Sequence, residues 1–175
     1  MRRPALAVTA LLLATPVLAQ SLSERSGLNS LMGASPSTAD FVKEAAVSDL
    51  FELQSSQLAA ERADEATKAF AAHMITDHQK TSTELKTMVQ SGAVKAEIPT
   101  TLDSAHQSKL DTLKGLNGDA FTKQYRADQV KAHKDAVDLF QRYAKGGDNA
   151  ELKAWAGKTE PSLAQHLKMA EDLGK

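Results

Sequence analysis

Apolar residues recur along most of this chain every three or four positions, a spacing that places their side chains on one face of an α-helix. The pattern predicts four long helices, at 38–62, 65–91, 119–145 and 149–172, and a short helix near 102–115. No segment alternates apolar and polar residues as a half-buried strand does. We therefore expect an all-α fold, an antiparallel up-down four-helix bundle with one short extra helix in its long central connection.

Local signals for helix starts and stops agree with this division of the chain. Ser37 and Asp40 have the spacing of a capping box, and Asp64 precedes the second long helix. We expect Gly146-Gly147 to end the third long helix. Pro161 lies inside the fourth, where it removes one backbone hydrogen bond and is expected to kink the helix without ending it.

The first residues have the layout of a secretory signal peptide, with two arginines followed by a short apolar run. That run is too short to span a bilayer, and Pro16 interrupts it. We expect residues 1–19 to be a signal peptide cleaved after Ala19, followed by a flexible leader at 20–37 and a helical domain at 38–173. The expected location is periplasmic or secreted.

The composition excludes several kinds of site and argues against several kinds of partner. The chain has no cysteine, which rules out disulfides, thiolate metal sites and iron–sulfur clusters. The chain has 21 basic and 22 acidic residues, and its lysines are spread among the acidic residues along the predicted helices. We therefore expect no nucleic-acid partner and no binding to an anionic membrane surface. The mature chain contains no apolar run long enough to be a transmembrane segment. The oligomeric state, a homo-oligomer included, is left open.

Each long helix carries one residue of a metal-ligand type on its apolar face. These residues are Glu52, His78, His133 and His166. Carboxylate and imidazole ligands suit zinc, iron, manganese or copper, and helical bundles often hold such ions between facing helices. Asp77, next to His78, is suited to orient a histidine ring from behind. Residue counts from the turns predict that His166 lies about 7 Å deeper than the other three, before any correction for a kink at Pro161.

Two interpretations of this polar centre remain open. In the first, the protein is a non-catalytic binding or stress-related module, and its central polar residues fix the packing through paired hydrogen bonds. In the second, it is a metal-binding protein whose ligand atoms converge at about 2.0–2.2 Å from one point. Hydrolase motifs are absent, so enzymatic activity is not indicated. His73 is expected to pair with Asp77 on the surface, and His106 to lie at a helix end or on the surface.

Four runs of sequence stand out beyond the helical pattern: DLFELQSS at 49–56, MITDHQK at 74–80, HKDAVDLF at 133–140 and PSLAQHL at 161–167. In this order they resemble the bacterial domain of unknown function 4142 family, over about residues 38–172. The resemblance implies an exported, ferritin-like helical bundle of undetermined activity, and it carries over no catalytic residue.

One departure from the wider ferritin-like pattern matters. Di-iron members of that fold carry Glu-x-x-His on two helices. Here Ile75 and Leu163 stand three residues before His78 and His166, so both carboxylates are missing. This difference argues against oxidase or ferroxidase chemistry and favours a mononuclear, histidine-rich site as the metal interpretation.

Overall fold

The computed structural model describes residue 30 and residues 32–175, so the predicted signal peptide and its cleavage site lie outside the described residues. This part of the chain is helical and contains no strand. Its helices are α3 (Thr38–Arg62), α4 (Glu65–Gln90), α5 (Ser104–Gly115), α6 (Gly118–Gly146) and α7 (Ala150–Asp172). The all-α prediction is confirmed, and every predicted helix is present with ends that differ by at most two residues.

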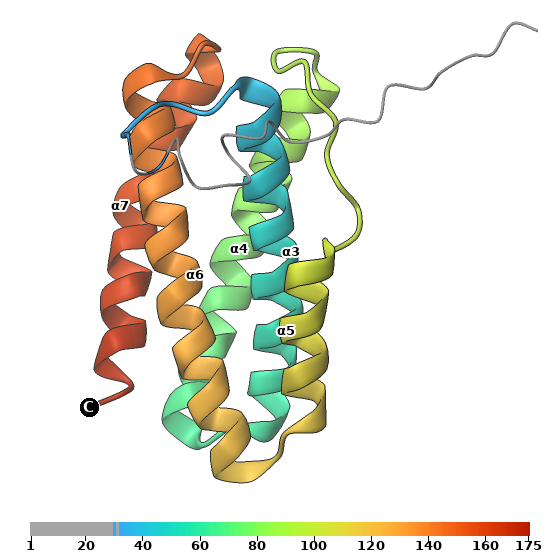
Figure 1. The fold of residues 1–175 in the computed structure, drawn as a ribbon, viewed down its shortest axis with the longest axis vertical. Helices are drawn as coiled ribbons and strands as arrows, with labels where there is room; N and C mark the ends of the chain where they lie inside the picture. The colour runs from blue at the N-terminus through green and yellow to red at the C-terminus, as the bar shows by residue number, and fades with distance from the viewer. Residues whose placement is uncertain (1–29, 31) are drawn as a thin grey trace, which may run out of the picture.

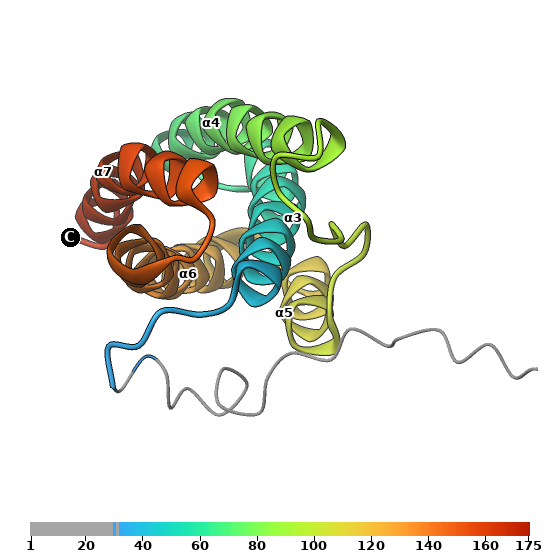
Figure 2. The same ribbon diagram turned by 90° about the horizontal axis from the view of Figure 1, so that it is seen from above.

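Four long helices lie side by side, and the short helix α5 lies outside them (Figure 1). Viewed from above, α3, α4, α6 and α7 surround a common centre, whereas α5 packs against α3 (Figure 2). The most extensive contacts join α3 to α4 and α6 to α7, the two pairs with short connections. Among the described residues, no helix combines the length and the hydrophobicity needed to cross a membrane.

Capping side chains explain where the helices begin. Ser37 and Asp64 each accept a hydrogen bond from the backbone N–H three residues further on, as predicted for N-caps. At α7 the cap is Asn149, whose side chain accepts from the N–H of Leu152 at 2.9 Å. The neighbouring Asp148 instead accepts a hydrogen bond from the hydroxyl of Thr38, which ties the α6–α7 turn to the start of α3.

The described end of the predicted leader lies against α6. Arg142 of α6 donates to the carbonyl oxygen of Ala34 at 2.8 Å, and Ser30 donates to the carboxylate of Asp138 at 2.8 Å. Pro36 is buried. Residues 34–36 therefore contribute to the packing of the helical domain.

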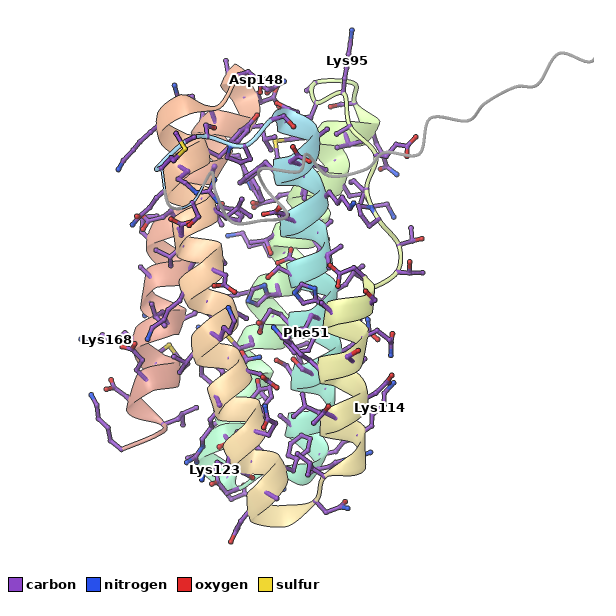
Figure 3. The ribbon with its side chains drawn as sticks, viewed as in Figure 1. Phe51, Lys95, Lys114, Lys123, Asp148 and Lys168 are labelled. Atoms are coloured by element: carbon purple, nitrogen blue, oxygen red, sulfur yellow. The ribbon has the colours of Figure 1, made fainter. Side chains whose placement is uncertain are left out.

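The apolar core is divided into two clusters. One cluster lies near the α6–α7 turn and contains Phe41, Phe140 and Tyr143, and the other lies near the α3–α4 turn and contains Phe51 and Tyr125. Lysines project from the outside of the helices, whereas Phe51 points inward (Figure 3). Buried polar residues occupy the level between the two clusters.

Trp155 lies at the edge of the first cluster and is partly buried. Its ring contacts Phe41 and Phe140, and its Nε1 donates to the carboxylate of Glu84 at 2.8 Å. This hydrogen bond connects α7 to α4.

Removing the ring at the centre of the first cluster tests this description of the core. Phe41 is fully buried, and its ring stacks on Tyr143 with centroids 4.1 Å apart. Phe41→Ala is expected to lower the free energy of unfolding by about 3–5 kcal/mol, measured by urea denaturation. The control Met32→Ala, at a residue that is 79% exposed, is expected to change it by less than about 0.5 kcal/mol. Equal effects of the two substitutions would contradict the assigned core.

Candidate metal centre

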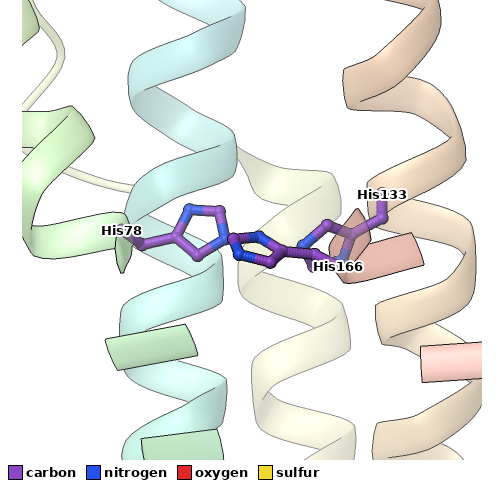
Figure 4. Close-up of side chains that lie close together, drawn as sticks. All are labelled: His78, His133 and His166. Carbon is purple, nitrogen blue, oxygen red and sulfur yellow. The ribbon is translucent and has the colours of Figure 1, made fainter. Parts of the chain in front are cut away.

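Three buried histidines from different helices meet at the level between the two apolar clusters. They are His78 of α4, His133 of α6 and His166 of α7. One ligand nitrogen from each lies within 4.8 Å of those from the other two, and the ring centroids are 5.4–5.7 Å apart. The three rings approach one another edge to face or at a tilt, in the space between the helices (Figure 4).

A carboxylate on α3 holds the first of these rings. His78 donates from Nδ1 to Oδ1 of Asp49 at 2.8 Å. The second oxygen of Asp49 accepts from the hydroxyls of Thr81 and Ser82, each at 2.9 Å. Asp49 is thus fixed by three hydrogen bonds from α4, and the orientation of the His78 ring is fixed with it.

The other two rings are held in a similar way. His133 donates from Nδ1 to the backbone carbonyl oxygen of Gln129, one turn earlier in α6, at 2.9 Å. His166 donates from Nε2 to Oδ2 of Asp77 at 2.9 Å, which links α7 to α4. Such hydrogen bonds from behind the ring are typical of metal-binding histidines, because they select the tautomer and the direction of the free lone pair.

The remaining nitrogen of each ring has no hydrogen-bond partner among the described residues. These atoms are Nε2 of His78, Nε2 of His133 and Nδ1 of His166, all buried from solvent. A buried polar atom without a partner costs about 1–3 kcal/mol, so three of them in one place require an explanation.

Glu52 of α3 lies next to the histidines but outside the group of three nitrogens. Neither of its carboxylate oxygens has a hydrogen-bond partner in the described part of the chain. Burial raises the pKa of Glu52 to about 7, although the positive charge of His78 and the amide of Gln129 oppose this rise. The charge of Asp49 adds to the rise and that of Lys109 opposes it.

The protonation states of the histidines differ because their surroundings differ. Burial lowers the pKa of His133 to about 3, and it also lowers the pKa of His166 despite the hydrogen bond to Asp77. Burial acts in the same direction on His78, but the hydrogen bond and charge of Asp49 outweigh it and raise that pKa. At neutral pH, His133 and His166 are therefore neutral imidazoles, each with a lone pair that a metal ion can use.

The predicted depth of His166 is wrong, since its ring centroid lies 5.4 Å from that of His133. Counting residues locates the Cα atoms, whereas helical side chains tilt toward the N-terminus of their own helix. In two antiparallel helices joined by a turn, this tilt moves the His166 ring toward the turn and the His133 ring away from it. The two rings therefore meet at one level.

The structure shows which carboxylates accept hydrogen bonds from His78 and His166, and the sequence pattern did not predict these pairs. Asp77 accepts from His166 across the helix interface rather than from its neighbour His78. Asp49, which shares the apolar face of α3 with Glu52, is the partner of His78. The sequence signal for this role of Asp49 was the presence of two acids, three residues apart, on the apolar face of one helix.

The remaining histidines lie where we expected them. His73 is near the surface, with Nε2 at 3.4 Å from Oδ2 of Asp77. His106 lies in the first turn of α5 and donates from Nδ1 to Asp103 at 2.8 Å.

The sequence profile of the family described as Domain of unknown function (DUF4142) matches residues 24–173, so the chain belongs to that family. The resemblance seen in the four motifs is thereby confirmed. No curated protein and no solved structure matches the chain.

The buried carboxyl group of Glu52 is expected to make stability depend on pH. Folding raises its pKa from 4.5 to about 7, so the stabilisation it provides is complete below about pH 4.5 and is lost as the pH rises through 7. The loss amounts to about 3 kcal/mol, at about 1.4 kcal/mol per pKa unit. Glu52→Gln is expected to abolish this part of the pH dependence in urea denaturation of metal-free protein between pH 4.5 and 8.5.

A matched control is Glu61→Gln, which removes an exposed carboxylate from the same helix. This control is expected to keep the pH dependence of the unchanged protein. If Glu52→Gln also kept it, the assignment of a buried, protonated Glu52 would be wrong.

Proposed function

We propose that this DUF4142 protein binds one divalent transition-metal ion through His78, His133 and His166, with Glu52 as the adjacent carboxylate. One observation supports this proposal above the others. Each imidazole has one nitrogen held by a hydrogen bond, while the other nitrogen is buried next to its two counterparts and has no partner in residues 30 and 32–175. This is the arrangement expected for preorganised metal ligands.

The electrostatics of the site also favour a cation. Asp49 accepts a hydrogen bond from His78 and Asp77 accepts one from His166, and Glu52 lies near enough to His78 for their charges to interact. Two of the three rings are neutral at pH 7. A divalent ion would favour the ionised form of Glu52, whose pKa burial raises to about 7, and would give the three remaining ring nitrogens a common partner.

The donor set narrows the choice of metal. Three imidazoles and one carboxylate suit zinc, copper, iron or manganese, and affinities for such nitrogen-rich sites rise toward Cu²⁺ and Zn²⁺. Nitrogens bound to one tetrahedral Zn²⁺ at about 2.0–2.1 Å lie about 3.3 Å apart. Metal binding is therefore expected to draw the three rings closer together.

A second candidate function has its own support. The hydrogen bond between His78 and Asp49 joins α4 to α3, and the one between His166 and Asp77 joins α7 to α4. These contacts would fix the packing of a non-catalytic binding or stress-related module even without a metal. The absence of metal from the functional protein would favour this alternative.

The proposal includes the architecture and the compartment. We propose an antiparallel up-down four-helix bundle of the ferritin-like type, supported by the arrangement of α3, α4, α6 and α7 around one centre. We also propose export, supported by the signal-peptide pattern at residues 1–19. N-terminal sequencing of protein recovered from the periplasm is expected to begin at Gln20, and an intact Met1 there would contradict cleavage.

Metal titration tests the proposed site directly. Metal-free protein is expected to bind about one equivalent of Zn²⁺ or Co²⁺, with a Co²⁺ spectrum typical of nitrogen-rich coordination. His133→Ala is expected to weaken binding by more than about 100-fold, because it removes a ligand rather than a residue behind one. Zn²⁺ at 100 times its Kd is expected to stabilise the unchanged protein by about 2.7 kcal/mol.

The matched control is His106→Ala, which removes a histidine that is also bonded to an aspartate but lies outside the cluster. It is expected to bind metal as the unchanged protein does. Two results would contradict the proposal: no stoichiometric binding by the unchanged protein, or equal losses in the two variants. Circular dichroism of His133→Ala would show that the variant is folded.

A further inference from the structure

A second group of ligand-type side chains lies between the histidine cluster and solvent. His73 and Asp77 of α4 and His166 of α7 each offer one atom, and these atoms lie within 4.8 Å of one another. The exposed fraction of the side chain falls from 45% at His73 and 36% at Asp77 to 4% at His166. The three residues thus form a continuous line from water to the core.

One carboxylate oxygen connects the members of this group. Oδ2 of Asp77 accepts from Nε2 of His166 at 2.9 Å and lies 3.4 Å from Nε2 of His73. The ring centroids of His73 and His166 are 5.4 Å apart. His166 belongs to both groups, because Nε2 faces Asp77 while Nδ1 is the buried, unpartnered nitrogen.

A hollow of about 100 Å³ lies in the surface between α4 and α7, beside this line. Its walls include Asp77 and two of the three core histidines, His78 and His166. Thr81, Ser162 and Glu84 add polar groups to the wall, and Lys80, Lys158 and Leu163 also line it, whereas His73 lies outside the hollow. The hollow therefore connects solvent with two of the core histidines and with Asp77, the residue that joins them to His73.

We propose that His73, Asp77 and His166 form an outer site for the same class of divalent transition metal, and that the ion enters and leaves the core through it. This inference rests on the proposed function of the core site. The outer site is the weaker of the two, because His73 and Asp77 are partly exposed and hydrated, whereas the core ligands are buried and held in place.

His166 belongs to both sites, and its chemistry allows it to bind a metal ion in only one of them at a time. A neutral imidazole has one proton and one lone pair, so it can bind a metal through only one nitrogen at a time. When Nε2 binds the outer ion, the proton resides on Nδ1. When the ion moves inward, Nδ1 loses its proton to water and becomes the ligand, while Nε2 takes up one proton from water and donates it in a hydrogen bond to Asp77.

The test is the rate of metal exchange rather than the affinity. Metal-free full-length protein is mixed rapidly with Co²⁺, and the spectrum of the core site is followed; release is then followed after addition of a chelator. His73→Ala is expected to slow loading by about tenfold, the lower end of what a charged cleft contributes to association. Release is expected to slow by the same factor, because removing a route leaves the core affinity unchanged.

Two further variants are compared with His73→Ala: one changes a second residue of the outer site, and the other is a control. Asp77→Asn keeps an oxygen that can accept from His166 but removes the charge, so it is expected to slow loading as His73→Ala does. Because Asp77 also holds the ring of His166 for the core site, this variant is expected to bind metal more weakly, and only its loading rate is compared. His106→Ala removes a histidine that is likewise bonded to an aspartate, on α5, and is expected to exchange metal at the unchanged rate.

The outcomes separate the two proposals. If the unchanged protein binds one equivalent and His73→Ala loads at the same rate, the outer site is wrong and the core site stands. If His73→Ala releases metal faster and binds it more weakly, His73 only supports the core structure, and the entry route is overturned. If the unchanged protein binds no metal, both proposals are wrong.

Discussion

A buried imidazole has two ring nitrogens, and each needs a partner once water is excluded. In this protein three buried histidines lie close together in the helical core, and each of them needs a partner for both ring nitrogens. The protein itself satisfies one nitrogen of each ring and leaves the other facing its neighbours. This arrangement costs stability, so the apolar clusters on either side must stabilise the fold.

The same hydrogen bonds fix the register of the helices. The contact between His78 and Asp49 sets the height of α4 against α3, and that between His166 and Asp77 sets α7 against α4. A shift of one residue along a helix moves a side chain by about 1.5 Å and rotates it by about 100°, which would break both contacts. The same hydrogen bonds therefore determine both the geometry of the site and the packing of the helices.

The spacing of apolar residues was sufficient to predict the helices. It was also sufficient to predict that Glu52 and the three histidines are buried, because the face of a helix on which a residue lies depends only on local spacing. The level of His166 could not be read from residue counts, since it depends on the tilt of side chains in antiparallel helices. The pairing of His78 with Asp49 rather than with its neighbour Asp77 depends on how α3 and α4 are aligned. Such pairings are properties of tertiary packing, and local spacing does not contain them.

Trp155, the single tryptophan of the chain, is placed where the fold can be followed optically. Its indole contacts Phe41 and Phe140 and donates to Glu84, so its surroundings include parts of α3, α4, α6 and α7. All indole emission from this protein thus arises at one edge of the first apolar cluster, near the α6–α7 turn and several turns from the histidines. Intrinsic fluorescence would register rearrangements of α7 against α4 without any attached dye.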